Sequence, residues 1–473
     1  MPFDYVVVGG GPTGMVIAHR MSRRGARVLL LEQSNDLGGC WKVAPDLTEH
    51  SPKVIDARSY PNFRHFVREL GAPFDTLPVY RRGLLKMALY FLRRLHPQDA
   101  LQLGVAIGST LLQSPRYEYH VSVQEWMDAR GISSSAKRAL RTLCIALANV
   151  PDKLRAGVLF DALATHPFPD LVRLKRPNEW IRRAKDALEA QGCALRFDVA
   201  VRSVLTAPDG PMQVIDAQGN VHEGRTVALC VPLTRLYEIV RHSDERMRRN
   251  WFPSMPTFKR FVDDSSYIGI GFLVRFDRRI DTARAEWCWS CRGDWTVIVI
   301  DKTPTKHRSR SVWSCAVVDL DTPSAHLGKA PRYCTMAELQ GEVLRQLEEA
   351  HGSDLRSKVE DVRPHGALTR DPERGWTTPY AGFSNIRGTL PQRGTAVANV
   401  FAVGPHTVPG VATLETAVES ALVFCQEPRR SAGTPLGVML ALTVLTVLTV
   451  LTPTILALLC TALVVGIAHL GLR

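Results

Sequence analysis

The strongest constraint on the fold lies in the first 32 residues of the chain. A short apolar run, Tyr5 to Val8, leads into a G-x-G-x-x-G motif at residues 9–14, and apolar residues at helical spacing follow. A second apolar strand then ends at Glu32, 18 positions after Gly14. This order of strand, glycine-rich turn, helix, strand and acidic residue predicts a βαβ unit, so an α/β domain with a parallel sheet is expected.

The glycine motif predicts a dinucleotide site because each of its positions has a physical role. Gly9 permits the tight turn, Gly11 lets the backbone approach a pyrophosphate, and Gly14 lets the helix pack closely on the strand. Pro12 and Thr13 open the helix, whose N-terminus then faces the phosphates. These five residues are therefore predicted to bind the cofactor.

Glu32 narrows the choice of dinucleotide. Its carboxylate can accept hydrogen bonds from the adenosine ribose hydroxyls and would repel a 2′-phosphate, so FAD or NAD is expected rather than NADP. Gly38 and Gly39 follow shortly after, and a second glycine pair lets the backbone approach the diphosphate again. Gln33, beside Glu32, is included in the predicted cofactor site.

From these residues up to about residue 426, the sequence resembles the flavin-containing amine oxidase superfamily, which includes monoamine oxidases, phytoene-type desaturases and protoporphyrinogen oxidases. The resemblance implies an FAD cofactor. It also implies that residues 194–204 form the strand whose backbone contacts the adenine, with Val201 at the matching position. Residues 226–236 resemble the strand and proline turn that precede the substrate domain.

The resemblance places a second FAD segment near the C-terminus. A strand ending at Gly404 would deliver the ribityl chain, and a helix beginning at Thr413, Leu414 and Glu415 would face the flavin pyrimidine ring. Reduced flavin carries negative charge near N1 and O2, which the free N–H groups and dipole of a helix N-terminus stabilise. An ordinary surface helix is the alternative.

Several positions depart from the pattern of the superfamily. Cys40 replaces the arginine after the glycine pair, and Pro405 replaces an acidic residue, for which His406 could substitute as a flavin contact. Residues 376–391 contain no cysteine that could attach the flavin, so noncovalent FAD is expected. Residues 410–413 lack the tyrosine of the monoamine oxidase aromatic cage, which argues against oxidation of a simple amine.

The catalytic residues are less well defined than the cofactor site. His50 could act as a general base, although loop packing explains it as well. Trp376 and Tyr380 are candidates for the pocket wall, with aromatic core packing as the alternative. Lys259 lies near the strand that often carries a flavin-side lysine, but a surface position is favoured.

Three other interpretations are considered: a flavin monooxygenase, a redox-active cysteine pair and an FAD-binding protein without catalytic activity. Residues 33–41 also resemble flavin monooxygenases, but no second dinucleotide motif for NADPH follows between residues 150 and 400. Cys288 and Cys291 form a C-x-x-C, interpreted as a structural pair because no thioredoxin-like unit surrounds it; no metal site is predicted. Cys40 and Pro405 would also suit an FAD-binding scaffold that has lost catalysis.

The alternation of helical and strand patterns predicts a discontinuous cofactor domain. Strands are expected at 267–275, 295–300, 312–320 and 399–403 in addition to those near the N-terminus. The expected segments are FAD-binding parts at 1–82, 191–240 and 376–428, a mostly helical substrate part at 83–190, a substrate sheet with helices at 241–375, and a membrane anchor at 429–473.

The C-terminal tail predicts attachment to a membrane. Residues 431–472 contain no Asp, Glu, Lys or Arg, and two apolar blocks of 16 residues flank Thr452, Pro453 and Thr454. Each block spans about 24 Å as a helix against a hydrocarbon core of about 30 Å, and a single crossing is favoured over a hairpin. Residues 434–472 would contact the membrane.

Charge and cysteine content suggest where the catalytic part lies. The net charge of +13 suits an anionic membrane surface or a nucleic acid, and the tail favours the membrane, so no nucleic-acid partner is expected. Ten scattered cysteines without a disulfide framework, and no signal peptide, predict a catalytic part that faces the cytosol.

The sequence therefore predicts a membrane-anchored FAD-dependent oxidoreductase that transfers hydride from a substrate C–H to flavin N5. An apolar, lipid-derived substrate is favoured over a small amine, because the aromatic cage is missing and the tail is apolar. The electron acceptor, dioxygen or a quinone, and the organelle are left open.

Overall fold

The computed structural model describes residues 1–51, 53–79, 95–111, 120–147, 149–165, 171–207, 210–280, 293–303, 309–352, 354–373 and 375–430. The predicted tail and the Cys288 and Cys291 pair lie outside these ranges. Within them, no helix is both long enough and apolar enough to cross a membrane.

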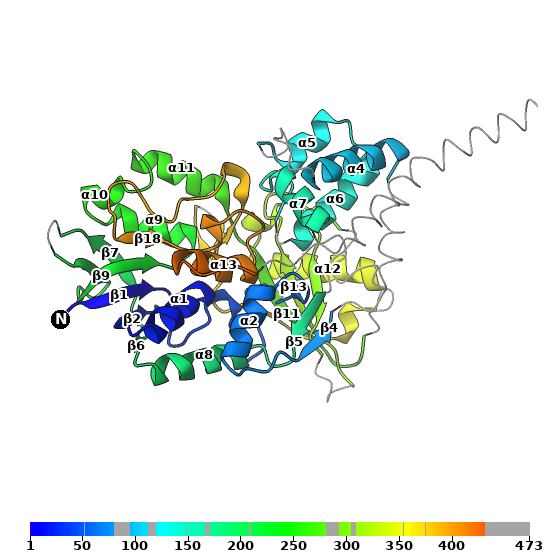
Figure 1. Ribbon diagram of the computed structural model, residues 1–473. Coiled ribbons are helices and arrows are strands. Elements are labelled where there is room, and N and C mark those ends of the chain that lie inside the picture. Colours follow the sequence, from blue (N-terminus) through cyan, green and yellow to red (C-terminus); the bar gives the residue numbers. More distant parts are fainter. Residues whose placement is uncertain are drawn as a thin grey trace, which may run out of the picture.

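The largest sheet has seven strands and begins with the predicted βαβ unit (Figure 1). Its strands are β1 (Phe3–Val8), β2 (Val28–Leu31), β6 (Ala194–Arg196), β7 (Val201–Leu205), β8 (Met212–Asp216), β9 (Val221–Leu229) and β18 (Val400–Ala402). Their order is β6-β2-β1-β9-β8-β7, and β18 also pairs with β9. β6, β2, β1, β9 and β18 are parallel, whereas β7, β8 and β9 form an antiparallel meander. The fold is α/β with a Rossmann-like sheet.

Helices cover both faces of this sheet, which explains why β1 and β2 are apolar at every buried position. Val7 and Leu30 face one core, with α1, α2, α8 and α13, while Val6 and Leu29 face the other, with α9, α10 and α11. The helices are α1 (Pro12–Arg23), α2 (Pro61–Glu69), α8 (Glu179–Ala190), α9 (Leu233–Arg241), α10 (Glu245–Arg248), α11 (Met255–Ser265) and α13 (Leu414–Phe424). Figure 1 shows α9–α11 on one side of the sheet and α1 and α8 on the other.

A second, antiparallel sheet has the order β12-β13-β11-β14. It lies within the segment 241–375 that was expected to hold a substrate sheet, so we call it the substrate sheet. Its strands are β11 (Ile270–Phe276), β12 (Ile298–Asp301), β13 (Val312–Val317) and β14 (Val359–Pro364). Helix α12 (Met336–His351) packs on it through Leu339, Val343 and Leu347, and a capping box between Thr335 and Glu338 fixes its first turn.

Four helices form a separate apolar cluster beside this sheet: α4 (Pro97–Leu111), α5 (Val123–Ala129), α6 (Ser134–Ala146) and α7 (Ala156–Thr165). The rings of Trp126 and Phe160 meet edge to face in its centre, 4.8 Å apart. An ion pair between Arg141 and Asp319 ties α6 to the end of the substrate sheet.

Small sheets and short 3-10 turns connect these units. The small sheets comprise β3 (Ile55–Asp56), β4 (Thr76–Pro78) and β5 (Leu171–Leu174); β10 (Ser266–Tyr267) and β17 (Gly382–Phe383); and β15 (Thr369–Asp371) and β16 (Gly375–Thr377). The 3-10 turns are η1 (Gly39–Trp41), η4 (Pro331–Tyr333), η5 (Arg356–Lys358), η6 (Asn385–Arg387) and η7 (Pro405–Thr407).

The packing differs from the expected segment boundaries at two places. Helix α8 was expected within the helical part at 83–190, yet Trp180 and Ile181 pack in the same core as Met15 of α1. Helices α10 and α11 likewise pack on the large sheet, beyond the boundary expected at residue 240. Local sequence patterns define helices but not the core to which an amphipathic helix docks, so the packing of these helices on the large sheet was not predicted.

The close contact of α1 with β1 makes a stability prediction. A Cβ atom at Gly14 would clash with the carbonyl oxygen of Gly9, which is backbone and cannot rotate away. Gly14→Ala should therefore destabilise the protein by about 1–3 kcal/mol and lower its Tm, measured by thermal unfolding. Gly341→Ala, in the middle of α12 with no atom within 4 Å of the added carbon, is the matched control and should leave Tm unchanged or raised. Equal effects in both variants would contradict the packing role.

Candidate functional site

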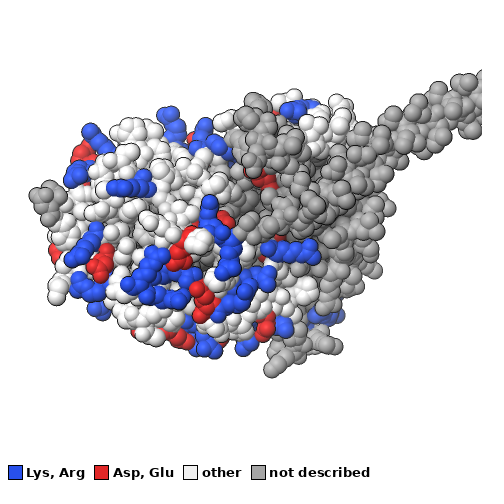
Figure 2. Space-filling model, viewed as in Figure 1, with Lys and Arg blue, Asp and Glu red and all other residues white. Residues whose placement is uncertain are grey.

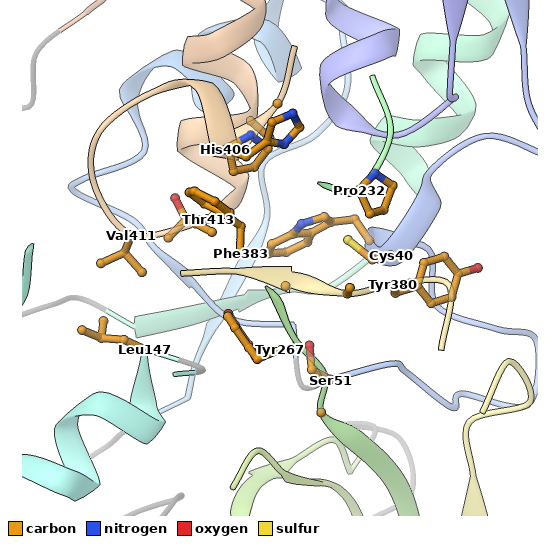
Figure 3. Close-up of a pocket in the computed structure, with 18 of the residues that line it drawn as sticks. Cys40, Ser51, Leu147, Pro232, Tyr267, Tyr380, Phe383, His406, Val411 and Thr413 are labelled. Atoms are coloured by element: carbon orange, nitrogen blue, oxygen red, sulfur yellow. The ribbon is translucent and has the colours of Figure 1, made fainter. Parts of the chain in front are cut away.

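A cavity of about 1000 Å³ lies where the three units meet. It runs from the carboxyl end of β1, past the loop that carries Cys40 and Ser51, to the helices around Leu147. In Figure 3, Leu147 and Val411 lie toward one end of the view and Cys40 and Tyr380 toward the other. Such a position at the carboxyl ends of parallel strands is where open α/β sheets bind ligands.

The glycine motif forms one wall of this cavity. Gly9, Gly11, Pro12 and Thr13 line it, whereas Gly14 lies behind them against Gly9. Gly9 has φ +103°, and a Cβ there would approach the Cys230 carbonyl oxygen to 2.5 Å. A Cβ at Gly11 would meet no atom within 4 Å, so this position faces open space. The structure therefore leaves room for a ligand where the pyrophosphate was predicted.

Glu32 lies at the edge of the same wall with its carboxylate fixed in place. One oxygen accepts the N–H of Gly10 at 2.6 Å and the other accepts the N–H of Ser34 at 2.8 Å. Glu32 and Gln33 both line the cavity, as does Val201 of β7. Remaining lone pairs of the carboxylate are available to ribose hydroxyls.

Gly38 and Gly39 lie close to the glycine motif at residues 9–14. Gly38 has φ +117° and donates its N–H to the Gly10 carbonyl at 2.9 Å, behind the cavity wall. Gly39 has φ +53°, lines the cavity, and would place a Cβ 3.2 Å from the Cα of Gly11. Both positive φ angles favour glycine, which explains the pair.

A second helix N-terminus reaches the cavity from the far end of the chain. Thr413 caps α13 through a capping box with Thr416, and the hydroxyl of Thr13 in α1 donates to the Ala417 carbonyl at 3.1 Å. Thr413 and Ala417 line the cavity. The side chain of Leu414 is instead buried in the core, so only its backbone N–H can serve a ligand. Two helix dipoles therefore point their positive ends at one site.

Glu415 does not point into the cavity. Its carboxylate accepts the N–H groups of Asn62 and Phe63 at 2.8 and 2.9 Å and the Asn62 amide at 2.7 Å, so it caps α2. Burial raises the pKa of this carboxyl to about 7, against the opposing effect of these hydrogen bonds. Like Leu414, Glu415 can offer a cofactor only its backbone N–H.

His406 is a buried polar residue on the cavity wall, together with Gly404 and Pro405. Burial lowers its pKa to about 4, so the ring is neutral at pH 7. Its Nε2 is buried and makes no hydrogen bond within the described part of the chain. The ring lies 6.1 Å from that of Phe383, edge to face. This orphaned nitrogen fits a polar edge of a bound cofactor.

Two of the three catalytic candidates lie at the cavity. The rings of His50 and Tyr380 line it with centroids 5.5 Å apart, and His365 packs against both. Burial, followed by the nearby Lys53 and His365, holds the pKa of His50 well below its usual value. This neutral imidazole remains a candidate base.

The pocket-wall position considered for Trp376 is wrong. Trp376 packs in the core of the substrate sheet and donates its indole N–H to the Cys334 carbonyl at 3.0 Å. Lys259 lies at the surface, as favoured, and pairs with Asp263 at 2.5 Å. Sequence patterns do not distinguish an aromatic residue that packs in a core from one that lines a pocket.

Lys53 was missed by the sequence analysis, yet it lines the cavity. Lys53 is 8% exposed to solvent, and its Nζ lies 5.5 Å from the centre of the Trp41 ring. Burial lowers the pKa of Lys53. No motif marks this lysine, which follows a loop and precedes β3, so only the tertiary fold reveals its position.

The end of the cavity beyond the glycine motifs is apolar. Helices α4, α6 and α7 and their flanking residues supply one wall, with Leu95, Leu103, Ile107, Leu140, Leu143, Leu147, Leu159 and Leu163. The substrate sheet, two small sheets and their flanking residues supply the other, with Val54, Leu171, Tyr267, Ile298, Ile300 and Val318. We call this part the apolar chamber. Within the described ranges, no cluster of His, Cys, Asp or Glu side chains could hold a metal ion.

These residues fit FAD. The space at Gly11, the fixed acid Glu32, the converging N-termini of α1 and α13, and the unpartnered Nε2 of His406 are spread along one cavity. An extended dinucleotide with a pyrophosphate and a polar ring system matches that arrangement.

The comparisons with known proteins agree with the fold. A family model described as an NAD(P)-binding Rossmann-like domain matches residues 7–70. Putrescine oxidase with bound putrescine superposes with a TM-score of 0.63 at 15% identity, covering 90% of this chain and 98% of that one. Cyclohexylamine oxidase from Brevibacterium oxydans gives 0.54 at 12% identity, with 90% and 99% covered. The chain therefore shares the fold of these two oxidases.

Other matches show how widely this fold is used. A fatty acid isomerase from P. acnes that produces CLA has a TM-score of 0.56 at 13% identity, covering 90% of this chain and 98% of that one. Among curated sequences, a flavin-containing monooxygenase of Arabidopsis thaliana is 41% identical over 46 residues, 10% of each chain. The thiamine thiazole synthase of Aeropyrum pernix is 56% identical over 36 residues, 8% of this chain and 13% of that one. The matches thus span about a tenth of the length of these curated relatives, and the amine oxidase fold rests on the structural comparison.

We call the part of the cavity lined by Gly9, Gly11, Glu32 and Gly39 the cofactor wall, and it leads to a prediction about FAD binding. Gly11→Val should fill the open space at the pyrophosphate position, and Glu32→Gln should remove the charge that receives the ribose hydroxyls, so both should lower the FAD content of the purified protein. Loss of hydrogen bonds to a charged group corresponds to about a tenfold or greater loss of affinity. The content is measured from the flavin absorbance per mole of protein, with Gly341→Val as the control. Full occupancy in both variants would contradict the assignment.

Proposed function

We propose that the protein is an FAD-dependent oxidoreductase of the amine oxidase type that removes hydride from a C–H bond of an apolar, lipid-derived substrate. The observation that carries this proposal is the single cavity in which the cofactor wall continues into the apolar chamber. A substrate in the chamber would meet the ring end of a cofactor held by the glycine motif.

The chain supplies binding and exclusion of water, while bound FAD supplies a hydride acceptor at its ring nitrogen N5. Glu32 and Gly11 would hold the adenosine and pyrophosphate. The N-terminus of α13 would stabilise negative charge on the reduced ring, through the N–H groups of Leu414 and Glu415. The leucine-rich wall of the chamber would keep the reacting carbon dry.

A small amine is the second candidate, because two structural neighbours are amine oxidases. Two observations favour an apolar substrate instead. The described lining around Leu147 is mostly aliphatic, and Lys53, which would repel a protonated amine, lines the cavity. The carboxylate of Asp56 also lines the cavity, but it already accepts the Ser59 hydroxyl and the Arg58 N–H.

We also propose that residues 434–472 attach the protein to a membrane with its catalytic part on the cytosolic side. The supporting features are the charge-free sequence of the tail and the net charge of +13. Figure 2 shows Lys and Arg side chains spread widely over the face in view. A membrane anchor would bring an apolar substrate within reach of the chamber.

Flavin chemistry gives the first test of this proposal. The purified protein should be yellow and should release FAD into the supernatant on acid precipitation, because no cysteine is available in residues 376–391. Its absorbance should then bleach under anaerobic conditions with a member of a panel of apolar lipids, and not with small amines. Flavin that stays in the pellet would contradict noncovalent binding. An FAD-loaded protein that no substrate reduces would support the scaffold without catalysis.

Deletion of residues 431–473 tests the anchor. The described core ends at Arg430, so the shortened protein should be soluble and loaded with FAD, whereas the full chain should need detergent. The measurement is sedimentation with membranes after a carbonate wash and in high salt, which removes electrostatic attraction but not apolar attachment. A shortened protein that is insoluble and lacks FAD would show that the tail belongs to the fold.

A further inference from the structure

Lys53 is a buried cation that forms no ion pair with a carboxylate among the residues that the structure describes. Its Nζ lies 3.5 Å from the Ser51 hydroxyl and above the Trp41 ring. Among the described residues, no carboxylate oxygen lies within 4.0 Å of it, although an ammonium group has three protons to donate. The side chain therefore faces the cavity with most of its hydrogen-bonding capacity unused.

Glu49, the carboxylate that acts electrostatically on Lys53, already has other partners. Glu49 forms an ion pair with Lys302 and accepts the Ser314 hydroxyl at 3.0 Å. Arg173 also lies within electrostatic reach of Glu49, and donates to the Thr303 carbonyl at 3.3 Å. Lys53 and Lys302 therefore share the electrostatic influence of Glu49, and Arg173 is also within reach of Asp301, so within the described part of the chain Lys53 has no carboxylate of its own.

An uncompensated charge in such a place is unfavourable. Burying an ion carries a large desolvation penalty unless a partner of opposite charge is supplied. Of the three cations, Lys53 is the one that lines the cavity, next to Val54, whose side chain forms part of the apolar chamber. A ligand with an acid group at Lys53 and a hydrocarbon chain along the chamber would satisfy both surfaces.

We propose that Lys53 binds the carboxylate of a long-chain aliphatic acid, which makes such an acid the substrate class of this enzyme. This inference rests on the proposed function, since it assigns the ligand of the same cavity. Ser51 is placed to donate a second hydrogen bond to the same carboxylate. The leucine side chains of the apolar chamber select for chain length and exclude water. Lys53 selects for the negative charge of the acid group.

The test uses the full-length, FAD-loaded protein in lipid nanodiscs and three probes that share one chain. Oleate, methyl oleate and oleylamine are titrated separately, and binding is followed by the change in the flavin absorbance spectrum. Oleate should bind most tightly. Lys53→Met should weaken oleate about tenfold or more, the loss expected for a hydrogen-bonded charge, while methyl oleate changes little.

Two further variants make the test specific. Lys42→Met removes a lysine from the same loop that pairs with Asp36 outside the cavity, and it should bind oleate like the unmodified protein. Lys53→Glu should reverse the charge preference of the site, so that oleylamine binds more tightly than oleate. The comparison of oleate with methyl oleate in the unmodified protein needs no variant, and so remains decisive if a variant fails to fold.

Three results would overturn the proposal in distinguishable ways. Equal binding of oleate and methyl oleate would exclude a role for Lys53 in charge recognition while leaving an apolar substrate in place. Loss of FAD from Lys53→Met, with normal FAD in Lys42→Met, would make Lys53 a cofactor contact. If none of the three probes changes the flavin spectrum, the apolar substrate itself is excluded and both proposals fail.

Discussion

The contact between α1 and β1 is the constraint on which the site depends. Because neither Gly9 nor Gly14 has a side chain, the helix starts directly at the end of the strand, and its N-terminus opens into the cavity. The hydroxyl of Thr13 then bonds to Ala417, which sets α13 beside α1 although 404 residues separate the two. One close backbone approach therefore positions both helix dipoles that would face a cofactor.

This arrangement gives the cavity two chemically different surfaces, one polar and one aliphatic. The Rossmann-like sheet ends in backbone N–H groups and a fixed acid, which suit phosphates and hydroxyls. The helices and the antiparallel sheet contribute aliphatic side chains that suit hydrocarbon. Lys53 and His50 lie between these surfaces, where polar and apolar parts of ligands would meet. In the proposed enzyme, substrate selection would depend on the units added to the Rossmann-like sheet.

The sequence was sufficient wherever the signal is local. The glycine motif, Glu32 and the capping residue Thr413 are fixed by steric and hydrogen-bonding rules over a few residues, and strands expected at 267–275 and 312–320 overlap β11 and β13. Positions that depend on tertiary packing could not be predicted. In the sequence Lys53 resembles any loop lysine, yet in the fold it lines the cavity, and Trp376 packs in an apolar core where its indole N–H donates to the Cys334 carbonyl.

Asn62 joins three parts of the molecule through short hydrogen bonds. Its backbone N–H and amide hold the carboxylate of Glu415, and the same side chain is bonded to both the N–H and the carbonyl of Arg430, at 2.8 and 3.0 Å. The backbone of Arg430, where the described part of the chain ends, is therefore held directly against α2, which Glu415 joins to α13. A pull on the chain at Arg430 would thus reach α13, whose N-terminus lines the cavity, through only two side chains, those of Asn62 and Glu415.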